Sequence, residues 1–182
     1  MNMNRVRIIG GTHRSRWIDF PDAEGLRPTP DRVRETLFNW LGQNLSGKHC
    51  LDLFAGSGAL GFEAISRGAG EVVMVESNRT AFRALHDNGK KLASANMVLK
   101  CEDGIEFARR ENRRYDVIFL DPPFQSDYLP RVLPLLADRL TEEGLVYVET
   151  AEPFEPGAMW QVVKRAKAGK VHYQLLQCKL KA

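Results

Sequence analysis

The sequence has 182 residues, of which 43% are hydrophobic and 27% charged, which fits one globular domain able to bury a sizeable core. The formal net charge of +3 is a weak indication of a polyanionic partner. Three scattered cysteines without CxxC spacing exclude a disulfide framework or a zinc-ribbon type of site. Because there is neither a signal-peptide pattern nor an apolar run of about 18 residues, we expect a soluble cytoplasmic protein that spans no membrane.

The first segment, residues 1–24, is predicted to form a basic hairpin arm. Strand-like pieces on either side of Gly10-Gly11 predict the hairpin. Arginines without intervening acids favour contacts with RNA phosphates, and a solvated strand pair is the alternative. We expect Trp17 to pack the arm onto the rest of the protein. The predicted RNA-contacting residues are Arg5, Arg7, Arg14, Arg16 and Arg27.

The remaining residues, 25–182, have the pattern of a single α/β domain. It opens with a helix, because apolar residues recur at helical spacing at Val33, Leu37, Phe38 and Leu41, and Asp31 or Thr29 is the expected N-cap. From Lys48 on, short apolar runs alternate with helical segments, which predicts a parallel sheet with crossover helices. The predicted strands are Cys50–Phe54, Val72–Glu76, Met97–Lys100, Val117–Leu120 and Leu145–Glu149, followed by an antiparallel hairpin of Gln161–Ala166 and Val171–Leu180. The predicted helices between the strands are Ala59–Arg67, Arg79–Ala93, Gly104–Asn112 and Leu129–Arg139.

A glycine-rich turn follows the first predicted strand of this sheet. Glycines allow the backbone to turn sharply and to approach a ligand closely. Gly56, Gly58 and Gly61 satisfy the spelling of the dinucleotide fingerprint, and Glu76 lies where an acid binds ribose hydroxyls. The fingerprint fits a nicotinamide enzyme and a methyltransferase equally, because both bind an adenosine ribose in this way.

Three further features favour a methyltransferase over a nicotinamide oxidoreductase. Asp52 lies inside the first strand, where a carboxylate is costly to bury without hydrogen bonds, so we expect it to brace the glycine loop and face a polar ligand. Asp103 follows the third strand, where an acid can meet an adenine amine. The fourth strand ends in Asp121-Pro122-Pro123-Phe124, which has no role in hydride transfer. Taken singly, Asp52 or Asp103 also fits a surface or capping carboxylate.

The tetrapeptide Asp121-Pro122-Pro123-Phe124 suits methyl transfer to the exocyclic amine of a base. Consecutive prolines make a rigid corner. If the Asp121 carboxylate and the Pro122 carbonyl accept hydrogen bonds from the amine, its lone pair is directed at a sulfonium methyl, and alignment supplies much of the catalysis. Phe124 offers a face for an unstacked base. The alternative is a proline-rich loop whose Phe124 fills the core.

These motifs resemble those of the RsmD family, from Arg7 through most of the chain. The resemblance rests on Asp121–Phe124, Leu51–Gly58, Gly25–Thr29, Asp31–Asn39, Arg7–Gly11 and Arg14-Ser15-Arg16, where the family usually has glycine in place of Ser15. It implies an α/β, Rossmann-like class I S-adenosylmethionine-dependent methyltransferase, with a seven-stranded mostly parallel sheet, a C-terminal antiparallel hairpin and the N-terminal arm. The implied reaction methylates the N2 amine of a guanine in 16S ribosomal RNA and leaves S-adenosylhomocysteine.

The resemblance also implies roles for individual residues. Asp52, Gly56 and Gly58 hold the methionine end of the cofactor, Glu76 holds the ribose and Asp103 the adenine. Thr29 and Arg34 approach the methionine carboxylate. The predicted cofactor set is completed by Phe54, Ser57, Ser77 and Gly104, and the reacting amine is surrounded by Asp121, Pro122, Pro123 and Phe124. The four histidines have no metal-ligand spacing, so no metal is expected, and we expect a monomer.

Other functions stay open at this point. A DNA adenine-N6 or cytosine-N4 methyltransferase would normally need a target-recognition segment for which this chain has little room. A non-catalytic RNA-binding assembly factor is the other alternative, although intact Gly56, Gly58, Glu76 and Asp121 argue against it. The expected partner is 16S ribosomal RNA, either bare or within the small ribosomal subunit.

Overall fold

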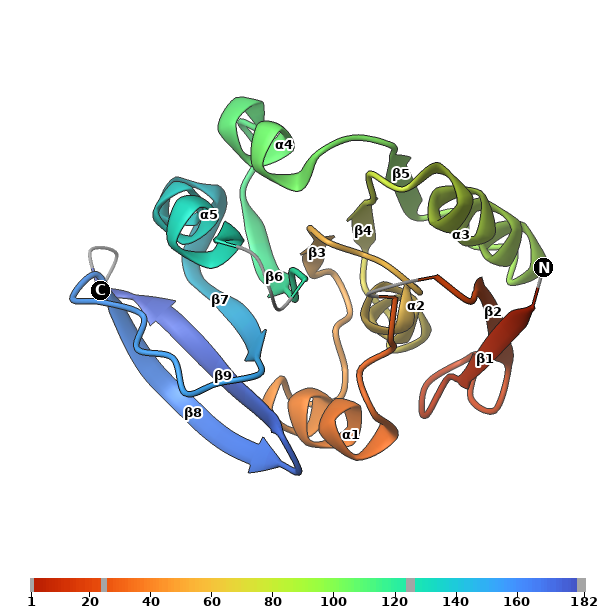
Figure 1. Ribbon diagram of the computed structural model, residues 1–182, viewed down its shortest axis with the longest axis horizontal. Helices are drawn as coiled ribbons and strands as arrows, with labels where there is room; N and C mark the ends of the chain where they lie inside the picture. The colour runs from red at the N-terminus through yellow and green to blue at the C-terminus, as the bar shows by residue number, and fades with distance from the viewer. Residues whose placement is uncertain (1, 24–25, 124–126, 180–182) are drawn as a thin grey trace.

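The computed structural model describes residues 2–23, 26–123 and 127–179. Its centre is a seven-stranded sheet in the order β5-β4-β3-β6-β7-β9-β8 (Figure 1). The strands are β3 (His49–Asp52), β4 (Glu71–Val75), β5 (Met97–Lys100), β6 (Tyr115–Leu120), β7 (Leu140–Thr150), β8 (Trp160–Ala168) and β9 (Val171–Cys178). β5, β4, β3, β6 and β7 pair in parallel, whereas β9 is antiparallel to both β7 and β8. The predicted mostly parallel sheet with a C-terminal antiparallel hairpin is therefore confirmed.

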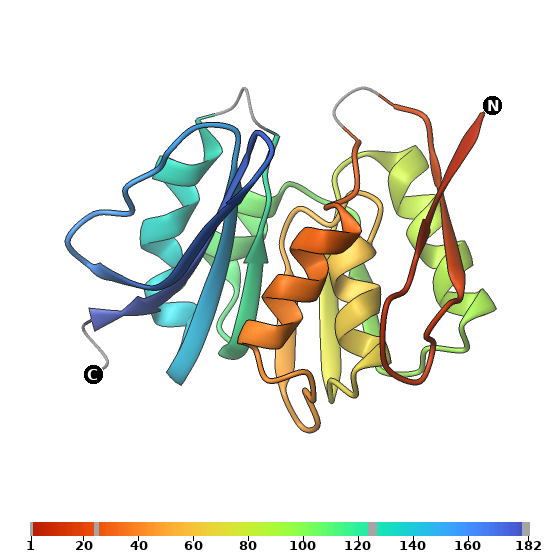
Figure 2. The ribbon, with the colours of Figure 1, turned by 90° about the horizontal axis from the view of Figure 1, so that it is seen from below.

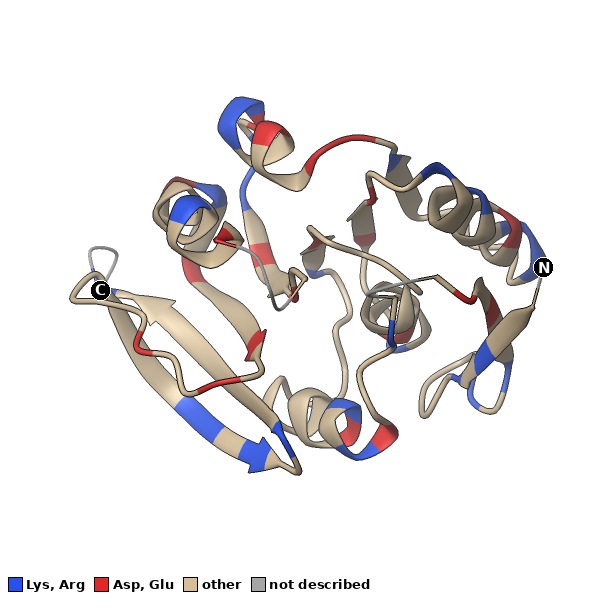
Figure 3. Ribbon diagram, in the orientation of Figure 1, with Lys and Arg blue, Asp and Glu red and all other residues tan. Residues whose placement is uncertain are grey.

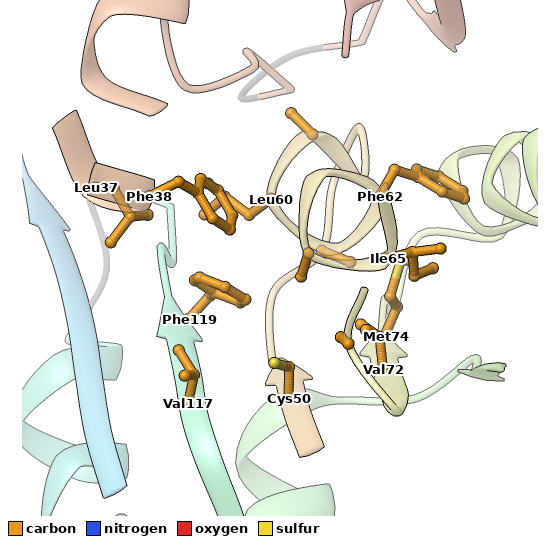
Figure 4. Close-up of a cluster of buried hydrophobic side chains, with 14 of the residues drawn as sticks. Leu37, Phe38, Cys50, Leu60, Phe62, Ile65, Val72, Met74, Val117 and Phe119 are labelled. Carbon is orange, nitrogen blue, oxygen red and sulfur yellow. The ribbon is translucent and has the colours of Figure 1, made fainter. Parts of the chain in front are cut away.

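Helices cover both faces of the sheet and create two cores. The helices α1 (Asp31–Trp40), α2 (Ala59–Ser66) and α3 (Arg79–Lys91) pack on one face, and α4 (Gly104–Arg110) and α5 (Tyr128–Leu136) on the other. Successive side chains of a strand point to opposite faces. On β6, Phe119 belongs to the first core, shown in Figure 4, and Leu120 to the second. Burial on both faces explains why the strands read as continuous apolar runs.

The predicted hairpin arm is present and is docked on the domain. Its strands β1 (Met3–Arg7) and β2 (Trp17–Pro21) pair antiparallel, and they lie beside α3 in both views (Figures 1 and 2). The apolar side of the arm is buried in the same core as α1–α3, through Val6, Ile8, Ile18 and Phe20. The side chain of Asn88 in α3 binds both the backbone N–H and the carbonyl of Asp19. The arm and the domain thus share one core.

The expectation that Trp17 packs the arm onto the domain is wrong. Trp17 is 43% exposed, and the Arg5 guanidinium lies 5.4 Å from its ring centroid. Because side chains alternate along β2, the burial of Ile18 directs its neighbour Trp17 outwards. Burial of Ile18 and Phe20, not of Trp17, docks the arm.

The loop between β1 and β2 contains a backbone conformation that favours glycine. Ser15 has a φ of +69°, in the left-handed region, and its N–H donates to the carbonyl of Ile8 at 2.8 Å. Glycine reaches this region without a steric penalty. This conformation gives a physical reason for the glycine that the RsmD pattern usually has in place of Ser15.

Three element boundaries differ from prediction for clear reasons. Pro30 takes the N-cap position of α1, so neither Asp31 nor Thr29 caps it, and the Thr29 hydroxyl is used elsewhere. Strand β7 begins at Leu140 instead of Leu145, because Leu140 pairs with Tyr115 before an irregularity in the ladder. The predicted helix Leu129–Arg139 ends as α5 at Leu136 and continues as the 3-10 turn Ala137–Arg139.

Candidate active site

Four acids that are far apart in the sequence lie along one edge of the sheet. Asp52 ends β3, Glu76 follows β4, Asp103 follows β5, and Asp121 follows β6. These strands are parallel neighbours, so their carboxyl ends meet at the same edge, where α/β sheets bind ligands. The strand order places the acids in the sequence Asp103, Glu76, Asp52, Asp121 across the sheet. One edge of the sheet therefore brings together four acids that the sequence motifs assign to the site.

The glycine loop between β3 and α2 requires its glycines. Gly58 is the N-cap of α2 with a φ of +83°, and a Cβ there would lie 2.6 Å from Cδ2 of Leu85. Gly56 also has a positive φ of +54°. Ser57 is buried, and its hydroxyl oxygen accepts a hydrogen bond from the Ala59 N–H at 3.2 Å. A side chain at Gly58 would therefore displace α3 or the loop.

Two carboxylates hold this loop from opposite sides. Asp52 is 2% exposed, and its Oδ2 accepts a hydrogen bond from the Gly61 N–H at 3.1 Å. Burial, against the opposing hydrogen bond from Gly61 and with a smaller contribution from the Glu76 charge, raises the pKa of Asp52 to about 7. Glu76 accepts from the Gly56 N–H at 2.8 Å and from the Asn78 N–H at 2.7 Å. The hydrogen bond from Gly61 agrees with the predicted bracing role of Asp52, and the predicted contact of Asp52 with a ligand stays a prediction.

The end of β5 shows a helix cap beside an aromatic pair. Asp103 is the exposed N-cap of α4, and its Oδ1 accepts from the backbone N–H groups of the next turn at 2.9 and 3.0 Å. In these contacts Asp103 acts as a helix-capping carboxylate, which is the alternative to a cofactor contact. A Cβ on Gly104 would lie 2.8 Å from the Leu53 carbonyl oxygen and 2.9 Å from the Phe54 ring. The half-buried Phe54 ring stacks on Tyr128 with centroids 5.4 Å apart.

The edge has the chemistry that an adenosine-containing cofactor requires. Glu76 is half-buried and Asp103 exposed, so carboxylate oxygens are accessible at the ends of β4 and β5. Ser77 is exposed between them, and the half-buried Phe54 supplies an apolar face. Each carboxylate oxygen has two lone pairs, so Glu76 can accept further hydrogen bonds while it holds Gly56. The residues present fit S-adenosylmethionine.

Asp121 lies next to a buried acid that sequence reasoning did not assign to the site. Leu120 pairs with Val148, so the residues that follow them, Asp121 and Glu149, are neighbours across β6 and β7. Glu149 is 4% exposed and accepts hydrogen bonds from the Thr29 hydroxyl at 2.9 Å and the Tyr147 hydroxyl at 2.8 Å. Its signal was available, because Glu149 is an acid at the end of a predicted strand, like Asp121.

The two neighbouring acids disturb each other's ionisation. Burial raises the pKa of Asp121 well above its usual value, and the charges of Glu149 and Asp52 raise it further, whereas a hydrogen bond with Thr29 opposes the shift. Burial also raises the pKa of Glu149, against the hydrogen bonds from Tyr147 and Thr29. The pair therefore holds a proton more readily than two surface acids do.

A pocket opens beside the two prolines that follow Asp121. Its volume is ≈ 170 Å³, which suits a single nucleobase, and its lining comprises Pro122, Pro123, Leu129 and residues 149–154. Pro122 is buried and Pro123 exposed, and Pro153 and Phe154 add apolar surface. The predicted base-stacking Phe124 lies outside the described residues, so its place is not assigned. No sequence pattern had indicated that Phe154 lines this pocket.

Comparison with known proteins decides the family. The family model described as "Conserved hypothetical protein 95" matches residues 6–177. The chain is 41% identical to ribosomal RNA small subunit methyltransferase D of Escherichia coli K12, over 95% of this chain and 90% of that protein. It is 39% identical to the Haemophilus influenzae protein of the same name, over 94% of this chain and 93% of that one. This chain belongs to the RsmD family.

Solved structures agree with the RsmD assignment. A putative methyltransferase from Escherichia coli superposes with a TM-score of 0.87 at 40% identity, covering 96% of this chain and 98% of that one. A putative methylase from Haemophilus influenzae superposes with a TM-score of 0.81 at 37% identity, covering 96% and 99%. The fold is that of class I methyltransferases, as predicted. Within residues 2–23, 26–123 and 127–179, no helix is long and apolar enough to cross a membrane, and no cluster of potential metal ligands is found.

In this RsmD-family structure Arg34 is a brace inside the fold. Its side chain is 1% exposed and donates to the Thr29 carbonyl at 3.0 Å, to the Arg7 carbonyl at 2.9 Å and to Asp31. These bonds join the arm, the segment before α1, and α1 itself. The predicted approach of Arg34 to the methionine carboxylate stays a prediction, and the hydrogen bonds seen for its buried side chain are with the protein.

The arginines predicted to bind RNA are all exposed. Arg7, Arg14 and Arg27 are exposed, and so is Arg16, whose Nη2 donates to the Lys91 carbonyl at 3.1 Å. Arg5 is also exposed and forms an ion pair with Asp19 at 3.0 Å. Figure 3 shows basic residues on the arm and a second basic stretch on the edge strand β8. The side chains predicted to contact phosphates are therefore accessible.

Proposed function

We propose that this chain methylates the N2 amine of a guanine in 16S ribosomal RNA, with S-adenosylmethionine as methyl donor. The observation that carries the proposal is the placement of Asp121 and the following prolines, which stand between the braced glycine loop and a pocket of ≈ 170 Å³. The RsmD-family relatives named ribosomal RNA small subunit methyltransferase D support the substrate class. The alternatives, DNA methylation and a non-catalytic assembly role, have no specific observation in their favour.

The cofactor would lie along the carboxyl edge of β3, β4 and β5. Glu76 would accept hydrogen bonds from the ribose hydroxyls, and Asp103 from the adenine amine. The methionine end would lie at the glycine loop near Asp52, while Phe54 would face the adenosine. When bound, S-adenosylmethionine supplies an electrophilic methyl group on a positively charged sulfur. Ser57, Ser77 and Gly104 would complete the lining.

The target amine would be held at Asp121. The Asp121 carboxyl group and the Pro122 carbonyl accept its hydrogen bonds, which localises the nitrogen lone pair that is otherwise delocalised into the ring. Because two prolines fix the backbone there, the acceptors are aligned before the base arrives. The apolar walls of the pocket, including Phe154, exclude water and offer contact to the base. Positioning and electrostatics are the main contributions of the protein.

The arm would supply contacts that do not depend on RNA sequence. Arginine–phosphate contacts release counterions, so RNA affinity should fall steeply as salt concentration rises. We propose that the protein acts as a monomer in the cytoplasm, on bare 16S ribosomal RNA or on the small subunit.

The decisive experiment measures transfer of labelled methyl from S-adenosylmethionine to small subunits and to bare 16S ribosomal RNA. Both substrates come from cells that lack this protein, and the product nucleoside is identified by mass spectrometry. We expect N2-methylguanosine. A different methylated nucleoside would change the assigned target atom, and no incorporation despite cofactor binding would favour the assembly-factor alternative.

A further inference from the structure

The acid behind Asp121 is built into the fold rather than left at the surface. Glu149 is 4% exposed, and the Thr29 and Tyr147 hydroxyls both donate hydrogen bonds to the same oxygen, Oε2. Burying a carboxyl group beside a second acid costs stability, since apolar residues of the same volume would avoid that repulsion. Packing alone therefore does not explain why an acid occupies this position.

Thr29 connects the two acids. Its hydroxyl donates to Glu149 at 2.9 Å, Asp121 neighbours Glu149 across β6 and β7, and Thr29 lowers the pKa of Asp121 as a hydrogen-bond partner. Thr29 is 3% exposed, and its carbonyl accepts a hydrogen bond from the buried Arg34 at 3.0 Å, so the residue is fixed in place. A hydroxyl is both donor and acceptor, so it can receive a proton from one acid while it gives its own proton to the other.

We propose that Asp121, Thr29 and Glu149 form a proton relay that removes the proton released by the methylated amine. The proposal rests on the proposed function, because it assigns the fate of a proton in that reaction. The amine nitrogen forms its bond to the methyl carbon as the carbon–sulfur bond breaks, and the sulfur keeps that electron pair. The N–H electron pair then returns to nitrogen as the proton passes to Asp121. As it accepts this proton, Asp121 passes the proton it already holds to the Thr29 oxygen, and the Thr29 hydroxyl proton moves to the charged Glu149.

The surroundings favour a proton shared within the pair. The groups that face it are Asp52 from β3, Tyr147 from β7, Tyr173 from β9 and, through the Thr29 carbonyl, Arg34 from α1. The negative charge of Asp52 opposes full ionisation of Asp121. Hydroxyl hydrogen bonds to Glu149 stabilise its charged form, so Asp121 is the member that holds the proton before the base enters. The amine donates to the unprotonated oxygen of Asp121, so Glu149 is still charged when the methylated amine releases its proton.

Glu149 also gives the proton a way out. It lines the same ≈ 170 Å³ pocket as the two prolines after Asp121, and that pocket is open to solvent. Once the product base leaves, water can enter and take the proton from Glu149. Asp121 is therefore the residue that touches the amine. Glu149 and Thr29 are positioning residues that act through Asp121, because they control whether its carboxyl group is protonated.

Single-turnover methyl transfer, measured against pH, tests the relay. In Glu149→Gln the competing charge is absent, so the acidic midpoint of the rate profile should move down by about one pH unit or more. In Thr29→Val the rate should fall roughly tenfold to hundredfold, within the range of proton-transfer catalysis, and Thr29→Ser should restore it. Thr141→Val is the matched control, because its hydroxyl also binds a carboxylate, Asp116, but at the amino end of β7. Unshifted midpoints together with a normal Thr29→Val rate would overturn the relay.

A second readout does not depend on activity. Carboxyl carbon NMR of the wild-type protein should show Asp121 and Glu149 titrating in two shared steps, and Glu149→Gln should reduce Asp121 to one step. Separate single-step titrations would overturn the proposal even if the variants fold poorly. Loss of methyl transfer in the wild-type protein, with the shared titration intact, would instead mean that the proposed function has failed.

Discussion

Replacing Asp52 by asparagine should stabilise the free protein at neutral and alkaline pH. Asp52 is 2% exposed, and burial raises its pKa from 3.8 to about 7. A carboxyl group with a raised pKa in the folded state binds its proton more tightly there than in the unfolded chain. Stability is therefore lost as pH rises from about 4 to about 7, and the loss is complete above that range. The shift corresponds to about 4 kcal/mol, at about 1.4 kcal/mol for each pKa unit.

An asparagine side chain keeps an oxygen acceptor for the Gly61 N–H but carries no charge. We expect Asp52→Asn to gain about 4 kcal/mol over the wild type between pH 4 and pH 8, as measured by urea unfolding at several pH values. Asp138→Asn, at an exposed position, is the control and should show no such pH-dependent difference. If the free-energy difference between Asp52→Asn and wild type is constant across this range, Asp52 does not titrate there and the reasoning is refuted.

Three further predictions concern the site and the arm. Asp121→Ala should leave cofactor affinity nearly intact in calorimetry while kcat falls by orders of magnitude, because it removes a contact to the reacting amine; equal losses of both would contradict that role. Glu76→Ala should weaken cofactor binding and loosen the glycine loop, since the Gly56 N–H loses its acceptor. Unchanged cofactor affinity would show that Glu76 does not contact the ribose. Ser15→Gly should raise the free energy of unfolding by about 0.5–1 kcal/mol, because it relieves a φ of +69°; a loss of stability in thermal melts would show that Ser15 is not strained.

Most of the fold could be predicted from local patterns. Strands buried on both faces read as apolar runs, and this pattern predicts the segments Val72–Glu76 and Val117–Leu120. The start of β7 at Leu140 was missed because the exposed Glu142 and Glu143 interrupt its apolar pattern. Pairing with Tyr115, a contact between distant segments, extends the strand in spite of these charges.

Local patterns were enough to predict the fold class, the glycine loop and the acids at the strand ends, because backbone preferences and strand endings are local properties. The partners that those side chains meet became known from the three-dimensional arrangement. Arg34 became a brace inside the fold, and Glu149 joined Asp121 through Thr29, because neighbouring strands and the segment before α1 bring these groups together. Such contacts join residues far apart in the chain, and no local pattern encodes them.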